Sequence, residues 1–239
     1  MSFIISLYVR EGIVLASDSR LTLNVQKKAG EKNVHQIAVG QSDSNYKTFL
    51  TDTHIGISTW GDAAVEGVPI GGYIESFISE VLQDQGYSVD EVPAKLIDYF
   101  KALPSPPNSG FFVAGYKQTD GQSEQHIWEV VLKLDRVERV NKDGGQGASW
   151  RGETDVMTRL IQPVFIQKAS GEYTAIPNYP IPWGFFTLQD AIDYATYAVR
   201  VTSDAMRFHP RPKTVGGPID ILVIKPNEAF WVQRKSLHA

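Results

Sequence analysis

The first twenty residues of the chain follow a pattern that leaves few ways to fold them. Residues 2–9 and 13–20 are two runs that begin with apolar, β-branched-rich sequence, and Arg10-Glu11-Gly12 separates them with a glycine that can adopt positive φ. Such a pattern predicts an antiparallel β-hairpin. Because its second strand returns alongside the first, we expect Asp18 to end close to Ser2.

A second hairpin is predicted further along the chain. Residues 46–51 and 55–62 are its two strand-like runs, and Asp52-Thr53-His54 supplies the turn. Lys47 begins this hairpin and Gly61 ends it. We therefore expect these two residues to lie near one edge of a sheet.

Ser2 directly follows Met1. Once Met1 is removed, Ser2 carries a hydroxyl and a free α-amine, and the pKa of such an amine is near 8. One residue can then supply both the nucleophile and the base for attack on a carbonyl carbon. A serine after methionine is uninformative by itself, so this hypothesis depends on the residues around it.

Three spaced elements of the chain resemble those of proteasome β-subunits, which are N-terminal-nucleophile hydrolases. The stretch Gly12–Arg20 matches the first family motif at the spacing that makes Ser2 the first mature residue. Lys47 with Gly61, and then Gly216–Asp220, match the second and third elements. The resemblance covers most of the chain and implies an α+β fold, a four-layer αββα sandwich. A bacterial protein of the ancestral β-subunit type is one of the homologues that this resemblance implies.

The remaining periodicity agrees with one domain over residues 1–239. Helical faces are predicted over residues 62–83 with a late start near Pro69, over 88–103 from a capping box, over 153–161, and from Thr187 to Thr202. Strands are predicted at residues 111–116, 126–134, 136–141, 219–224 and 229–232.

Two stretches, Thr22–Tyr46 and Ile166–Phe186, are longer than the corresponding family segments, and we expect both to be long loops. Loops of this length are usually functional or mobile. The second is rich in proline and aromatic residues, which favours contact with a partner or another subunit over an inert insertion.

The resemblance also implies a mechanism. The Ser2 hydroxyl would attack an amide carbonyl while its own α-amine accepts the proton. Lys47, held near Asp18, would keep a positive charge beside the hydroxyl and the amine, and the Gly61 N–H would stabilise the oxyanion. Each residue has a plainer interpretation: Asp18 as a turn-end residue paired with Arg20, Lys47 as a solvated charge, and Gly61 as a connector between a strand and a helix.

Further site residues are implied by the same resemblance. Ser149 and Asp204 are the candidates for the serine and the aspartate that support the nucleophile. Asp204 lies opposite the apolar stripe of its predicted helix, so it reaches the site only if that helix ends or bends before it. Thr22 matches a position that binds the substrate backbone, and Thr59 and Ala63 match positions that line the pocket before the scissile bond.

Composition narrows the other possibilities. A net charge of -4 and 21% charged residues give no reason to expect binding to nucleic acid or to an anionic membrane. The absence of cysteine excludes disulfides and thiolate nucleophiles, and it suits a cytoplasmic protein. We expect no signal peptide, no membrane span, no cofactor and no metal.

Three classes of function remain open at this stage. The first is a threonine-type endopeptidase that uses Ser2 on peptide or protein substrates within a homo-oligomeric ring or helical assembly. The second is an amidohydrolase or acyltransferase of the same superfamily that acts on a small amide. The third is a non-catalytic scaffold subunit that retains Met1. The sequence does not indicate an ATP-dependent unfoldase as partner.

Overall fold

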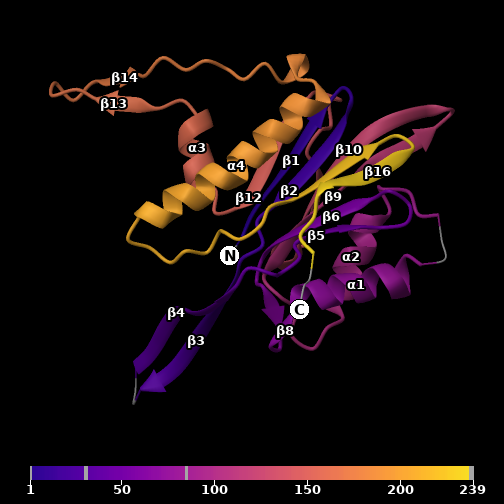
Figure 1. Ribbon diagram of the computed structural model, residues 1–239, viewed down its shortest axis with the longest axis horizontal. Coiled ribbons are helices and arrows are strands. Elements are labelled where there is room, and N and C mark those ends of the chain that lie inside the picture. The colour runs from indigo at the N-terminus through magenta and orange to yellow at the C-terminus, as the bar shows by residue number, and fades with distance from the viewer. Residues whose placement is uncertain (1, 30–31, 84–85, 237–239) are drawn as a thin grey trace.

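The fold is mixed α+β (Figure 1). The computed structural model describes residues 2–29, 32–83 and 86–236, and the description leaves out the side chains of residues 24–39. Within those residues there are four α-helices: α1 Ile70–Val81, α2 Val92–Lys101, α3 Asp155–Ile161 and α4 Leu188–Phe208. Two short 3₁₀ helices are η1 Leu132–Leu134 and η2 Trp183–Phe185.

The described strands form two five-stranded antiparallel sheets and three two-stranded ribbons. The first sheet has the order β12-β1-β2-β15-β16, and the second has the order β11-β10-β9-β6-β5. The first comprises β1 Phe3–Val9, β2 Gly12–Ser17, β12 Gly147–Gly152, β15 Asp220–Lys225 and β16 Glu228–Gln233. The second comprises β5 Thr48–Leu50, β6 Gly56–Gly61, β9 Ser109–Thr119, β10 Gln122–Val131 and β11 Arg136–Arg139. The ribbons are β3 Leu21–Ala29 with β4 Lys32–Ser42, β7 Ala64–Val65 with β8 Val68–Pro69, and β13 Phe165–Gln167 with β14 Tyr173–Ala175.

Apolar side chains pack on both faces of each large sheet. One cluster joins β1, β2 and β15 to β9 and β10, with Leu15 and Phe112 among its members. A second lies between the other face of the first sheet and α3 and α4, and a third lies between the second sheet and α1 and α2. Every residue of β1 and β2 is buried, as expected for strands covered on both faces. Figure 1 shows α3 and α4 on the side of the molecule away from α1 and α2.

Both predicted hairpins are confirmed. The first pairs Ile4 with Ser17, and the Asp18 N–H donates to the Phe3 carbonyl at 3.2 Å. The returning strand therefore brings Asp18 to the start of β1, as predicted. The second pairs β5 with β6 around the turn that contains His54, which has a positive φ of 60°.

The observed starts of the first two helices confirm one predicted boundary and correct the other. The late start of the first helix is confirmed, because α1 begins after Pro69 and residues 64–69 form the β7–β8 ribbon. The second helix begins at Val92, one turn later than predicted. Glu91 accepts a hydrogen bond from the Ser88 N–H, but the Ser88 hydroxyl bonds Asp90 and leaves the capping box incomplete.

The predicted start of the last helix is correct. Thr187 caps α4 in a reciprocal capping box with Asp190. The helix then continues without a break to Phe208, which decides the position of Asp204 below.

Both stretches that we expected to be long loops contain paired strands, so neither is a loop throughout its length. Residues 21–29 pair with residues 32–42 as the β3–β4 ribbon, and residues 165–175 form the β13–β14 hairpin. Alternation of apolar and polar residues, as in Leu21-Thr22-Leu23, was the signal for the first ribbon. In Figure 1 both ribbons extend away from the two large sheets.

Among the helices that the structure describes, none is both long enough and apolar enough to cross a lipid bilayer.

The contact between the two sheets can be tested at Gly56. A Cβ there would lie 2.6 Å from a Leu15 methyl and 2.8 Å from an Ile224 methyl. We expect Gly56→Ala to lower the free energy of unfolding by about 1–3 kcal/mol, because the added methyl overpacks this interface. Urea unfolding monitored by circular dichroism measures the change.

Gly72→Ala is the matched control, because Gly72 lies in α1 with open space around the Cβ position. Alanine favours the helix there, so we expect a gain of about 0.5–1 kcal/mol. Equal effects of the two substitutions would contradict close packing of the sheets at Gly56.

Candidate active site

A fully buried carboxylate, Asp18, lies at the centre of the candidate site. Its Oδ1 accepts hydrogen bonds from the Phe3 N–H at 2.9 Å and from the Lys47 ammonium at 2.7 Å. Its Oδ2 accepts from the N–H groups of Arg20 and Gly216, both at 3.1 Å. A carboxylate with no exposed surface needs such partners, because an unpaired buried charge is very costly. Asp18 thus joins its own segment to three other parts of the chain, at Phe3, Lys47 and Gly216.

Lys47 is almost as deeply buried, with 2% of its side chain exposed. Burial lowers the pKa of Lys47, and the negative charge of Asp18 opposes this effect. The alternative in which Lys47 is a solvated surface charge is therefore wrong. Its backbone carbonyl accepts a hydrogen bond from the Thr59 N–H at 2.9 Å, which places Lys47 beside the end of β6.

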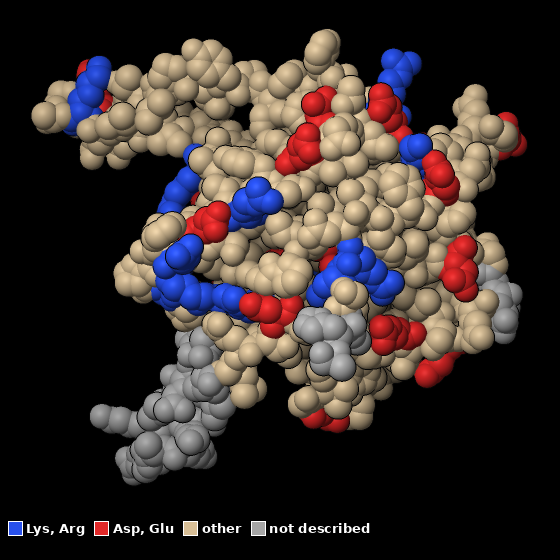
Figure 2. Space-filling view, viewed as in Figure 1, with Lys and Arg blue, Asp and Glu red and all other residues tan. Residues whose placement is uncertain are grey.

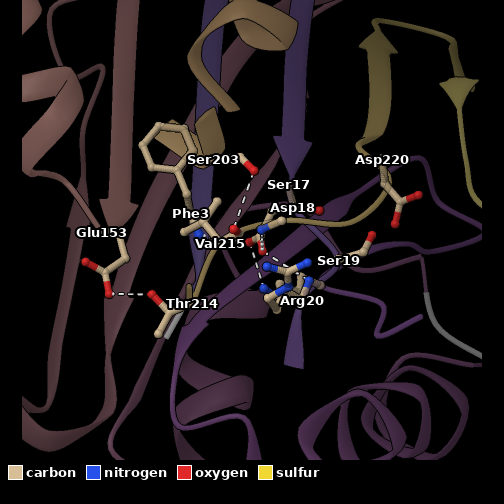
Figure 3. Close-up of polar contacts among 12 residues, drawn as sticks. Phe3, Ser17, Asp18, Ser19, Arg20, Glu153, Ser203, Thr214, Val215 and Asp220 are labelled. Atoms are coloured by element: carbon tan, nitrogen blue, oxygen red, sulfur yellow. Dashed lines mark hydrogen bonds and ion pairs between the residues drawn. The ribbon is translucent and has the colours of Figure 1, made fainter. Parts of the chain in front are cut away.

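The guanidinium of Arg20 is not the partner of Asp18. It forms a two-pronged ion pair with Asp43, with both N–O distances at 2.7 Å. It also lies against Gly216, where a Cβ would come within 2.6 Å of the Arg20 Cζ. Figure 3 shows Asp18, Ser19 and Arg20 following one another at this point. The alternative that pairs the Asp18 and Arg20 side chains is therefore wrong, although the Arg20 backbone does donate to Asp18.

Ser2 is 4% exposed and is held through the peptide group that follows it. The carbonyl of this group accepts from the Glu153 N–H at 2.8 Å, and its N–H, on Phe3, donates to Asp18. Gly152 makes this possible: it has φ of 92°, and a Cβ there would lie 1.8 Å from the Ser2 carbonyl oxygen. The same Asp18 oxygen that accepts from Phe3 also accepts from the Lys47 ammonium. One Asp18 oxygen therefore binds both the Lys47 ammonium and the peptide N–H that follows Ser2.

Gly61 ends β6 with φ of 102°. A Cβ there would lie 2.4 Å from the Asn108 carbonyl oxygen and 2.8 Å from the Ser109 Cα, so no other residue fits without a backbone shift. Because the chain continues into the β7–β8 ribbon, the alternative of a simple strand-to-helix connector does not describe it.

Two of the three predicted substrate-binding residues share a groove. Thr22 and Ala63 line a cavity of about 440 Å³ together with residues of β4 and of the β7–β8 ribbon. The Thr22 hydroxyl is buried and has no hydrogen-bond partner among the described residues. Thr59 does not line this cavity: it is buried, and its hydroxyl donates to the Gly110 carbonyl at 3.4 Å. The structure therefore brings Thr22 and Ala63 together and leaves Thr59 out.

Ser149 is not at the site. It lies within β12 opposite Ser6, four residues along β1 from Ser2. At about 3.3 Å per strand residue, this separates the two positions by roughly 13 Å. The prediction is wrong because it missed the strand β12, whose Gly147–Gly152 sequence lacks a regular apolar alternation.

Asp204 is also not at the site. It is exposed on the outer side of α4, opposite the buried Val199, Thr202 and Met206. The helix neither ends nor bends before this residue, so the condition that we attached to the prediction is not met. Its neighbour Ser203 lies near the Val215 carbonyl at 3.5 Å (Figure 3).

Sequence reasoning missed a polar cluster beside Ser2. The Glu153 carboxylate accepts from the Thr214 hydroxyl at 2.8 Å, and Arg211 lies 3.8 Å from Glu153 and 3.1 Å from Asp155 (Figure 3 shows Glu153 and Thr214). The cluster joins the start of α3 to the segment before β15. The placement of Glu153 after the sharp Gly152 turn was the available signal, but it is visible only once β12 is known to pair with β1.

No family model matches the chain, and the comparison with curated proteins found no match.

The Asp18–Lys47 pair can be tested by removing one charge at a time. Asp18→Asn or Lys47→Met leaves its partner buried without an opposite charge. We expect each variant to lower the free energy of unfolding by about 3–5 kcal/mol. The double variant should lose clearly less than the sum of the two. Denaturant unfolding of all four proteins gives this coupling energy.

Lys225→Met is the control, because its ion pair with Glu228 is solvent-exposed and such pairs contribute little. Additive losses at Asp18 and Lys47, or losses no larger than that of Lys225→Met, would contradict a buried ion pair.

Proposed function

We propose that this chain is a proteasome β-subunit-like hydrolase that cleaves peptide bonds with Ser2 as nucleophile after Met1 is removed. The supporting observation is the shared Asp18 oxygen, which accepts from both the Lys47 ammonium and the peptide N–H that follows Ser2. This arrangement places a buried cation beside the Ser2 backbone and leaves the other end of Ser2 for the chemistry.

We include in this proposal the four-layer αββα sandwich that such hydrolases have. The three apolar clusters support it, because they lie between the two sheets and between each sheet and one pair of helices. The observed order of elements supports it too: strands, two helices, strands, two helices and strands, with small ribbons between them.

The proposed reaction proceeds in two halves. The Ser2 hydroxyl attacks the carbonyl carbon of the scissile amide, and its proton passes to the α-amine and then to the leaving amine. Water, activated by the same α-amine, then hydrolyses the resulting ester. The positive charge of Lys47 favours the neutral, basic form of the α-amine and the ionised form of the hydroxyl. The Gly61 N–H stabilises the oxyanion, a contribution worth roughly 3–4 kcal/mol when one such donor is lost in other enzymes.

The groove that contains Thr22 and Ala63 is the proposed place for the substrate. Residues of the β3–β4 and β7–β8 ribbons line it, so strand backbone is close to any peptide that binds there. A small amide is the alternative substrate, and the test below separates it from a peptide.

The role of Ser2 is tested by intact-mass measurement and covalent labelling. We expect the native protein to lack Met1. We also expect a β-lactone to acylate Ser2 and raise the mass of the protein by that of one probe molecule. Ser2→Ala should abolish this labelling, whereas Ser149→Ala, which changes a serine away from the site, should leave it unchanged. A protein that retains Met1, or a Ser2→Ala variant that is still labelled, would contradict the proposal. Labelling by the lactone without cleavage of any peptide library would favour the small amide.

We also propose that the protein forms a homo-oligomer and that the arm, defined as residues 162–186, contributes to the contact. All residues from 162 to 180 are exposed, including Tyr179 with 86% of its surface accessible. A lone two-stranded hairpin is marginally stable in water, so apolar side chains such as Phe165 and Tyr173 need a cover. Figure 2 shows the arm as a largely uncharged projection.

The charges on the arm favour a second copy of the chain as the partner that covers its exposed apolar side chains. Lys168 and Glu172 are the only charged residues between positions 162 and 186, and they flank the hairpin turn. Neither forms an ion pair with another described residue. In a two-fold contact between hairpins, Lys168 of each copy faces Glu172 of the other. A nearly neutral arm also lets two acidic chains meet without repulsion.

Charge reversal tests this contact. We expect Lys168→Glu and Glu172→Lys each to weaken self-association roughly fivefold, because each puts like charges together. The double reversal should restore it, and Lys225→Glu, outside the arm, should have no effect. Sedimentation velocity measures the association. A protein that stays monomeric, or a double reversal no better than the single ones, would contradict pairing of the arms.

A further inference from the structure

A second buried ion pair, Lys235 with Asp220, lies beside the first. Asp220 has no exposed surface, and 5% of the Lys235 side chain is exposed. The Lys235 N–H donates to the Asp220 Oδ1 at 2.8 Å, and its ammonium bonds the Asp220 Oδ2. Both charges of this pair are therefore withdrawn from water. The sequence motif contained Asp220, but nothing in the polar tail marked Lys235 as buried.

The two ion pairs share one edge of the first sheet. Asp220 begins β15 directly opposite Ser17, and Ser17 immediately precedes Asp18. The two carboxylates thus leave neighbouring strands at the same level. Figure 3 shows Asp220 on the strand next to the Ser17–Asp18 segment.

Lys235 also holds the residue that precedes Lys47. The Tyr46 hydroxyl donates to the Lys235 carbonyl at 3.1 Å, and the Lys235 ammonium lies 4.3 Å from the centre of the Tyr46 ring. The neighbouring Arg234 guanidinium lies 5.0 Å from the same ring and 4.8 Å from the Trp231 ring. The segment after β16 is thus packed against the start of the Lys47 strand.

The charges around Lys47 form one coupled group. Burial lowers the pKa of Lys47, and the cations of Lys235 and Arg20 lower it further, while Asp18 raises it. Burial also lowers the pKa of Lys235, against the opposing effect of Asp220 and of Asp18, and Arg234 adds a lowering contribution. Asp43 completes the group: its ion pair with Arg20 lowers the pKa of its carboxyl, and the charge of Lys47 lowers it further.

We propose that Lys235 is a positioning residue of the Ser2 centre: through Tyr46 and through its charge it fixes where Lys47 lies and the pH range in which the centre works. This inference rests on the proposed function. Lys235 acts on the Lys47–Asp18 pair and does not itself touch the substrate.

The sign of the effect follows from the charges. Without the Lys235 cation, Lys47 and the Ser2 amine both hold their protons to higher pH, so the whole activity profile moves upward. Without the Asp220 anion, the Lys235 cation is uncompensated and the profile moves downward. Removing both charges changes the local net charge by zero, so the profile of the double variant stays near that of the wild type. We expect single shifts of about one pH unit.

The experiment is the rate constant for β-lactone labelling of Ser2, measured against pH on the full chain without Met1. The variants are Lys235→Gln and Asp220→Asn, which retain hydrogen-bonding groups, their double variant, and Lys235→Arg, which keeps the charge and should keep the wild-type profile. Opposite shifts of the two single variants, cancelled in the double, support the inference. Equal losses of rate without a shift in the pH profile, or unchanged profiles, would overturn it. A residue with a merely structural role would lower the rate constant but leave its pH dependence unchanged.

The design separates this inference from the proposed function. Absence of labelling at Ser2 in the wild type contradicts the proposed function, whereas labelling with no opposite shifts contradicts only the role of Lys235. If one single variant does not fold, the other single variant compared with the double variant still isolates the effect of one charge.

Discussion

The structure depends on the Asp18 carboxylate more than on any other single group. Its two oxygens accept from the start of β1, from Lys47, from the nearby Arg20 N–H and from the loop before β15. A carboxylate can be fully buried only when its acceptor sites are occupied, and here three of the four donors come from other parts of the chain. One residue thus links the start of β1 in the first sheet to Lys47, which precedes β5 of the second sheet.

Part of the candidate site can be predicted from local sequence, and the other part depends on contacts between residues far apart along the chain. The position of Asp18 beside Ser2 is a consequence of one tight hairpin. The burial of Lys47 is not local, because its partner Asp18 lies 29 residues away along the chain. The predictions for Ser149 and Asp204 were wrong because local sequence does not determine where these residues lie. The position of Ser149 depends on the register of β12 with β1, and that of Asp204 on the uninterrupted length of α4. No window of sequence contains that information. Lys235 was missed for the same reason, since its partners Asp220 and Tyr46 lie far from it along the chain.

The predicted fold class was easier to obtain than its details. Apolar periodicity identifies the helices and most strands because burial on one or two faces imposes it. The ribbons were harder, since the β13–β14 hairpin is exposed throughout and shows no buried face. Exposed strands of this kind are specified by pairing and by what covers them, so their sequences resemble those of loops.

The contacts of Ser2 bear on how such a centre could become active. Two hydrogen bonds among the described residues hold its C-terminal side: one to its carbonyl, and one from the N–H of Phe3. Removal of Met1 changes the other side and leaves these two bonds intact. The fold can therefore form first, with Asp18, Lys47 and Gly152 fixing the Ser2 backbone, and the amine can be released afterwards. Under the proposed mechanism, maturation needs no rearrangement of the site, because the only group that changes is the base itself.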